Sequence, residues 1–413
     1  MADAPATTAP ATKADLSGIC IGLVGPLPPL RGGISLYVQR LASRLTARGA
    51  RVVVLATNGG TQAEAGVRAY ATPTGRGLAL ACARIAASER IDLLHFHTFG
   101  AYWKEMLPFV ALQRLSGVPV IVSQHSFISD VAAMKPNDTR MLALCVQGLA
   151  RVVTSGPAVL AKLLQAGARR EKMTAVVPFI APPLEDLTTA AWPADIAAIR
   201  QNCRPIIASG TGRLDAVQGR DLYGLDQFVQ AARSVLTQVP DAGFVYLIGA
   251  EGDAELLRSA KAYVLEHGLQ SRVCIHVGPL PGPLMWQAAD VYVRPTLDDG
   301  DAVSIREAMY LGVPTVASDV VGRPAGCLTY RGGDAADLAR VLLEVASDLE
   351  GNRKNVAENR PLEAVDDLVA VYLQTLHQKS PLRQITRALA QRLTATGLVG
   401  HVARAVQRTR QPS

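Results

Sequence analysis

The chain has 413 residues, of which 49% are hydrophobic and 19% charged, and its formal net charge is +7. This length exceeds the usual size of one compact core, so we expect two domains. No run of about 18 apolar residues occurs, which argues against a transmembrane helix. The six cysteines stand singly, without C-x-x-C pairs, so we expect free thiols in a reducing cytoplasm rather than disulfides or zinc sites.

Residues 1–18 are rich in Ala, Thr and Pro, which predicts a disordered tail. After them, short β-branched runs alternate with helical patterns. Within the first helical pattern, Ile34, Val38 and Leu41 share one face, which is typical of a helix covering a sheet. The runs expected to form buried parallel strands are 19–24, 51–56, 91–97, 118–123 and 151–154.

A second alternating series follows an Ala/Pro-rich stretch at 181–205. Its expected strands are 206–209, 244–248, 273–277, 291–294 and 315–317. The fold class is therefore α/β, with two Rossmann-like doubly wound domains at 19–195 and 196–360. Ligands of such sheets bind beyond the carboxyl ends of the strands, so the residues that follow each strand are the candidates for chemistry.

A Gly- and Pro-rich loop, Gly25-Pro-Leu-Pro-Pro-Leu-Arg-Gly32-Gly33, joins the first strand to the first helix. Its glycines would let the backbone approach a ligand, and free amides at a helix N-terminus favour an anion. The loop lacks the G-x-G-x-x-G spacing of a dinucleotide site. A structural turn with proline at the helix entry is therefore an equal alternative.

The segment from Asp299 to Ser318 follows the strand that ends at Arg294 and runs into a helix, with Asp299 and Glu307 eight residues apart around the helix start. A nucleotide sugar needs free amides for its diphosphate, a carboxylate for two ribose hydroxyls and a further acceptor for sugar hydroxyls. This segment could supply all three.

This segment resembles the E-x7-E motif of the family-4 retaining glycosyltransferases of the GT-B fold, including the hydrophobic and Gly-x-Pro continuation of that motif. Other family features follow in order: Gly32-Gly33, His95-Phe-His97, Ser123-Gln-His125, Gly212-Arg213-Leu214, Leu247-Ile-Gly249 and Ala288-Ala-Asp290-Val-Tyr-Val-Arg-Pro. The resemblance covers most of residues 19–375. It implies two Rossmann-like domains facing a central cleft, and a helix at 361–378 that crosses back to the first domain.

The resemblance also implies roles for individual residues. Glu307 would bind the ribose, the amides of Ala302 and Val303 the diphosphate, and Asp299 the donor sugar. The other implied site residues are Ser304, Gly32 and Gly33 on the donor, Arg213 on the phosphate charge and His125 on the acceptor side near the transferred sugar.

Three positions depart from the family pattern: Asp299 replaces its first Glu, Asp301-Ala302 replaces Phe-Gly, and Tyr223-Gly224 replaces Lys-Gly. Arg220, three residues before Tyr223, is a candidate to replace the missing lysine. Asp299-Gly-Asp301 also matches the short D-x-D metal signature, but the surrounding segment favours a donor site that needs neither metal nor cofactor. Asp298 and Asp301 then serve as turn or cap acceptors.

The net positive charge has one origin, because no acidic residue follows position 378. The tail carries seven basic residues: Lys379, Arg383, Arg387, Arg392, Arg404, Arg408 and Arg410. Without them the chain would be neutral, which favours a local electrostatic role over nucleic-acid binding. Leu382, Ile385 and Leu389 recur at helical spacing, so 379–413 reads as a basic amphipathic extension. It either binds an anionic membrane surface or docks on the body.

The expected function is transfer of a sugar from a UDP-, GDP- or ADP-linked donor to the hydroxyl of a carbohydrate or lipid-linked acceptor, with retention. The expected setting is polysaccharide or glycolipid assembly, in the cytoplasm or at the inner face of the membrane. Two alternatives stay open: a sugar-nucleotide epimerase of the same fold, and a non-catalytic subunit that binds nucleotide sugars.

Overall fold

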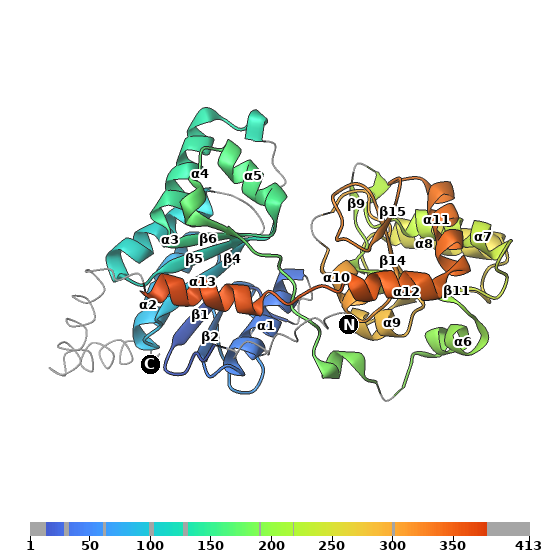
Figure 1. Ribbon diagram of the computed structural model, residues 1–413, viewed down its shortest axis with the longest axis horizontal. Helices are drawn as coiled ribbons and strands as arrows, with labels where there is room; N and C mark the ends of the chain where they lie inside the picture. The colour runs from blue at the N-terminus through green and yellow to red at the C-terminus, as the bar shows by residue number, and fades with distance from the viewer. Residues whose placement is uncertain are drawn as a thin grey trace, which may run out of the picture. The chain divides into compact units, whose positions relative to one another are not determined.

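The chain forms two α/β units in a computed structural model that describes residues 14–28, 33–60, 63–98, 103–126, 131–189, 191–217, 219–299 and 302–377 (Figure 1). Within these residues, the first unit contains the segment before Leu30, Leu41–Val177 and the segment that begins at Val365. The second contains Arg31–Arg40 and Pro178–Ala364. Each unit has its own parallel sheet and apolar core, as the sequence predicts.

The first unit has a seven-stranded sheet in the order β3-β2-β1-β4-β5-β6-β7, in which all pairs are parallel. Its strands are β1 (Cys20–Gly25), β2 (Arg51–Ala56), β3 (Arg68–Ala71), β4 (Leu93–Thr98), β5 (Val120–Gln124), β6 (Arg151–Thr154) and β7 (Met173–Ala175). The helices between them are α1 (Gly33–Thr46), α2 (Leu78–Ser88), α3 (Trp103–Ser116), α4 (Pro136–Gly148) and α5 (Pro157–Gln165). Strands β1, β4 and β5 are buried along their length, which explains their continuous apolar runs.

The second unit has a six-stranded parallel sheet in the order β12-β11-β8-β13-β14-β15. Its strands are β8 (Ile206–Arg213), β11 (Gly243–Ala250), β12 (Val273–Val277), β13 (Val291–Arg294), β14 (Thr315–Ser318) and β15 (Leu328–Tyr330), with a separate antiparallel pair of β9 (Ala216–Val217) and β10 (Arg220–Asp221). Its helices are α6 (Ala194–Asn202), α7 (Leu225–Leu236), α8 (Ala254–Glu266), α9 (Gly282–Gln287), α10 (Val303–Tyr310), α11 (Ala335–Ser347) and α12 (Leu349–Glu358).

The last described helix, α13 (Val365–His377), belongs to the first unit although it follows the second in the chain. It lies over the seven-stranded sheet (Figure 1), where the hydroxyl of Tyr372 is 2.6 Å from Nδ1 of His95 on β4. None of the described helices combines the length and apolar character that crossing a membrane requires.

Two expected boundaries differ from the structure. The main segment of the second unit begins at Pro178 rather than near residue 196, because Phe179 and Ala181 are bonded to its end. Ala364 N–H donates to the Phe179 carbonyl, and Ala181 N–H donates to the Glu363 carboxylate. The expected tail at 1–18 is too long, since Leu16 is buried and its N–H donates to the Arg48 carbonyl. Residues 1–13 and the expected extension at 379–413 lie outside the described residues.

Candidate active site

The order in which the strands are added to the six-stranded parallel sheet reverses between β8 and β13. These two strands are neighbours in space although β11 and β12 separate them in the chain. In a doubly wound sheet this switch point leaves a crevice at the carboxyl ends of the strands, where ligands bind. Arg213 is the last residue of β8, and Asp299 lies in the loop after β13. The structure therefore brings both predicted donor residues to the end of the sheet where a donor is expected.

Asp299 is held by two arginines. Arg294, the last residue of β13, approaches it with Nε and Nη2 at 3.2 Å each, and Arg323 approaches with Nη1 at 2.9 Å. The hydroxyl of Thr296 donates to the same carboxylate at 3.1 Å. The side chain is only 8% exposed, so these contacts form a buried charge cluster.

Burial alone would raise the pKa of Asp299, but Arg294 and Arg323 outweigh it, and the pKa is lowered from its ordinary value. The carboxylate is therefore ionised at neutral pH. Its two buried arginines depend on it in turn, because an arginine cannot lose its charge by deprotonation. Sequence reasoning singled out Asp299 as a sugar ligand but missed this second task.

Helix α10 begins beside this cluster. Its N-cap, Ala302, has no side-chain oxygen, so the cap residue itself gives the first-turn amides no hydrogen bond. Val303 opens the helix, and the Ser304 hydroxyl accepts a hydrogen bond of 2.7 Å from the buried Tyr292. Helix amides of this kind attract an anion, so the geometry is compatible with the predicted diphosphate contact.

Glu307 lies one turn further along α10 and is buried. Its Oε1 accepts a hydrogen bond of 2.6 Å from Nη1 of Arg40, a residue of α1 that belongs to the second unit. Burial raises the pKa of Glu307, and the Arg40 charge partly opposes that rise. Sequence reasoning did not find Arg40.

The remaining predicted donor residues are exposed. The side chain of Arg213 is 66% exposed, and its Nε lies 3.5 Å from the Asp215 carboxylate. Arg220 is exposed on β10. Among the described residues, neither arginine forms an ion pair with a buried carboxylate, so both side chains can turn toward a ligand.

Tyr223-Gly224, which stands at the family's Lys-Gly position, has a packing role. Gly224 has φ of +69°, and a Cβ there would lie 1.9 Å from the Pro295 carbonyl oxygen, so no other residue fits. The Tyr223 ring lies under the Arg294 guanidinium, 5.6 Å from its centroid. The loop thus supports the arginine cluster.

In the first unit, the histidines form a polar cluster in which His95 and His97 lie buried on β4 and the half-buried His125 follows β5. Nε2 of His95 is 2.7 Å from the Ser123 hydroxyl, while Nδ1 of His97 is 3.1 Å from Nε2 of His125. The His95 and His97 rings are 4.1 Å apart. The structure therefore connects His125 with the two histidines that the sequence placed on a strand.

All three histidines are neutral at physiological pH. Burial lowers the pKa of His95 to about 3 and that of His125 to about 4, and burial and the other two rings lower that of His97. A neutral imidazole both donates and accepts a hydrogen bond, which suits a group facing a hydroxyl. Of the predicted glycine pair, Gly33 opens α1 with free space around its Cα, while Gly32 and Asp301 lie outside the described residues.

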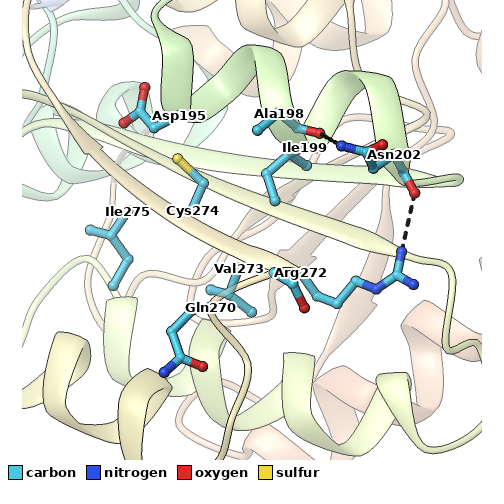
Figure 2. Close-up of a pocket in the computed structure, with 10 residues that line it drawn as sticks. Asp195, Ala198, Ile199, Asn202, Gln270, Arg272, Val273, Cys274 and Ile275 are labelled. Atoms are coloured by element: carbon cyan, nitrogen blue, oxygen red, sulfur yellow. Dashed lines mark hydrogen bonds between the residues drawn. The ribbon is translucent and has the colours of Figure 1, made fainter.

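A cavity of about 610 Å³ lies elsewhere in the second unit, between α6 and the edge strand β12. Figure 2 shows its lining, including Asn202, Arg272 and Cys274, and Nη1 of Arg272 donates to the Asn202 carbonyl at 3.2 Å. None of the predicted site residues lines this cavity. It is at the edge of the sheet, away from the switch point, and supplies no feature of a diphosphate site.

Comparisons with known proteins identify the family of the chain. The model of Glycosyltransferase Family 4 matches residues 31–182, and that of the glycosyl transferases group 1 matches residues 210–348. The chain is 27% identical over 362 residues to a D-inositol 3-phosphate glycosyltransferase of Arthrobacter sp. (strain FB24), covering 77% of this chain and 82% of that protein. It is 26% identical over 312 residues to a 2-deoxystreptamine N-acetyl-D-glucosaminyltransferase of Streptomyces fradiae, covering 71% and 70%.

Among solved structures, Anabaena HepE in complex with UDP superposes with a TM-score of 0.63 at 16% identity, covering 86% of this chain and 100% of that one. This likeness shows the fold. The two family models divide at the same linker region as the two sheets, one covering the sheet with the histidine cluster and the other the sheet with the arginine cluster. The chain is therefore a retaining glycosyltransferase of family 4 with the GT-B fold, and it uses a nucleotide-sugar donor.

Proposed function

We propose that the protein transfers a hexose from a nucleoside-diphosphate donor to the hydroxyl of a carbohydrate or lipid-linked acceptor. The observation that carries this proposal is that the start of α10, whose N-cap Ala302 makes no side-chain hydrogen bond, and the buried carboxylate of Glu307 lie on one helix after β13, at the switch point of the sheet. These are the two contacts that a diphosphate and a ribose need. UDP is the best-supported nucleotide, because HepE, which shares the fold, was solved with it.

In this proposal the amides of Ala302 and Val303, with Ser304, hold the diphosphate, and Arg213 and Arg220 balance its charge. Asp299, fixed by its two arginines, faces the donor sugar. The bond from the anomeric carbon to the diphosphate breaks while the acceptor oxygen bonds to that carbon on the same face. The acceptor proton passes to the leaving phosphate oxygen, whose charge the helix amides and Arg213 stabilise.

His125 is the proposed acceptor-side residue, and its neutral ring can bond to a hydroxyl without competing with the diphosphate for cations. Gly33, with Gly32, gives the backbone room on the donor side. The reaction is proposed to need no metal ion, so a chelator should leave the rate unchanged.

The basic residues at 379–413 support a second element of the proposal, attachment to an anionic membrane surface. Each basic residue near such a surface contributes about 1 kcal/mol. Co-sedimentation with vesicles containing anionic lipid should be lost when 379–413 are deleted and weakened by salt. Equal co-sedimentation of the full and shortened chains would remove this element.

The test of function uses thermal stabilisation by UDP-, GDP- and ADP-glucose, then NMR of the product. A donor at 100 times its Kd should stabilise the folded state by about 2.7 kcal/mol. Glu307→Ala should abolish that shift, and the anomeric configuration of the product should match that of the donor. Donor binding without any glycosyl product would instead support a non-catalytic subunit.

A further inference from the structure

Arg40 is the most deeply buried cation near the candidate donor site that the proposed chemistry leaves without a role. It is 5% exposed. Nη1 donates to Glu307 at 2.6 Å and lies 3.2 Å from the Ile180 carbonyl, while Nη2 lies 3.7 Å from the Asp186 carboxylate. Arg40 is therefore fixed by two groups and directed at a third.

Two nitrogen atoms of the Arg40 guanidinium make no hydrogen bond to the described residues. Its Nε and Nη2 have no hydrogen-bond partner among the described residues, although both atoms are buried. A buried donor without a partner costs about 1–3 kcal/mol, and more for a charged group, so native proteins rarely leave one. A ligand that brings oxygen atoms to this position would remove that cost.

Glu307 and Arg40 together offer complementary groups at one point. The carboxylate only accepts hydrogen bonds and the guanidinium only donates them. A hydroxyl does both, so each hydroxyl of a vicinal diol can donate a hydrogen bond to the carboxylate and accept one from the guanidinium. A diphosphate would match the arginine but be repelled by the carboxylate. The pair therefore fits a neutral diol better than an anion.

We infer that Arg40 is a donor-binding residue, which with Glu307 forms a two-part subsite for the ribose diol of the nucleoside diphosphate. This inference rests on the proposed function and adds the residue that fixes the Glu307 carboxylate and contacts the ribose oxygens. A second effect follows from charge. The titratable or charged groups around Glu307 are Arg40 on α1, Asp186 before α6 and Tyr292 on β13, and Arg40 is the cation among them.

The experiment is calorimetric titration with UDP and 2′-deoxy-UDP, and with the GDP and ADP pairs in parallel, against the full chain. The variants are Arg40→Gln, which keeps a polar amide but removes the charge, and Arg40→Lys, which keeps the charge but removes the planar guanidinium. The matched control is Arg48→Gln in the turn that follows α1, because the partner of Arg48 is the exposed Asp366. Thermal unfolding checks that each variant folds.

Arg40→Gln should weaken UDP binding about 10- to 100-fold, as loss of charged hydrogen bonds implies. It should weaken binding of 2′-deoxy-UDP far less, because one hydroxyl is already missing. Its UDP affinity should also rise with pH more steeply than that of the wild type, since the pKa of Glu307, already raised by burial, rises further without Arg40. Arg40→Lys should restore the flatter pH profile, and Arg48→Gln should bind like the wild type.

The outcomes separate the two proposals. If the wild type binds none of the nucleoside diphosphates, the proposed function fails. If the wild type binds one but Arg40→Gln binds it equally well or more tightly, the function stands and the role of Arg40 fails. Equal losses for UDP and 2′-deoxy-UDP, with an unchanged pH profile, would show that Arg40 only supports the fold, and would also overturn the inference.

Discussion

The two units differ in the charge of the ionisable side chains that they bury. In the first, His95, His97 and His125 lie together, and burial lowers the pKa of all three so that they stay neutral. In the second, Asp299 and Glu307 are buried beside arginines, and the arginines lower the pKa of Asp299 and oppose the rise that burial causes in the pKa of Glu307. A fixed charged framework suits a donor that carries a diphosphate, whereas a neutral hydrogen-bonding surface suits an uncharged hydroxyl. The difference also predicts distinct responses to acid and to mutation.

The largest effect should come from acid acting on the first unit. The folded-state pKa values of the three histidines lie below the unfolded value of about 6.5, so the unfolded chain binds more protons as the pH falls. Stability is fully present above pH 6.5. Between pH 7 and pH 5 it should fall by up to about 6 kcal/mol, or about 2 kcal/mol for each histidine.

Tryptophan emission during urea unfolding measures the loss of stability in each unit, because Trp103 lies in the first unit while Trp192 and Trp286 lie in the second. A chain that keeps only Trp103 reports the histidine cluster. The matched chain without Trp103 should show a smaller shift, since the lowered pKa of Asp299 acts only below its ordinary value of 3.8. A first-unit midpoint that is level from pH 7 to pH 5 would contradict the neutral cluster.

Next in size is Asp299→Asn. The substitution leaves Arg294 and Arg323 buried without their carboxylate, which should cost about 3–5 kcal/mol of unfolding free energy in the second unit. Glu344→Gln is the control, because its pair with Arg340 is exposed and should contribute about 0.5 kcal/mol or less. Urea unfolding followed by Trp286 emission compares the two. Equal small losses would show that the arginine cluster is not a buried charge unit.

A smaller loss is expected from Tyr372→Phe. It removes the hydroxyl that lies 2.6 Å from Nδ1 of His95 and leaves a buried ring nitrogen without that partner, at about 1–3 kcal/mol. Ser123→Ala should act similarly through Nε2. In urea unfolding read by Trp103, the double variant should depart from additivity, because both changes act on one ring. Strict additivity would mean that His95 does not couple them.

The smallest effect on stability belongs to Arg213→Ala. Since its side chain is 66% exposed, unfolding free energy should change by no more than about 0.5 kcal/mol. Affinity for UDP should nevertheless fall about tenfold, if the cation turns to the diphosphate. Thermal unfolding and calorimetry on the same sample test both statements. Unchanged affinity would leave Arg213 as a surface residue.

The strands that the sequence predicted are those with continuous apolar runs, such as β1, β2 and β8, and all of them are present. The strands missed in the two main sheets, β3, β7 and β15, are short and lie at sheet edges. Strand β3 has no buried residue, so its pattern carries no burial signal. Pairing with a buried neighbour, rather than its own composition, makes such a segment a strand.

For the site, the sequence located the loops but not the partners of the charges. Asp299 and Glu307 were found because they lie in one continuous motif. Arg323 follows Asp299 by 24 positions and Arg40 precedes Glu307 by 267, so no local spacing connects either pair. Arg294 carried a usable signal, a charged residue ending a buried strand. The ligand contacts themselves stay predictions.

Helix α13 has a consequence for how the protein is made. Because the first unit uses Val365–His377, a ribosome must finish the whole second unit before the first has all its parts. Until then His95 lacks the Tyr372 hydroxyl. The second unit, whose six strands are contiguous from Ile206 to Tyr330, can complete its sheet earlier. The first unit would then finish folding after the second, although its synthesis begins earlier. A chain halted at Ala364 would carry a complete second unit and a first unit whose sheet still lacks α13.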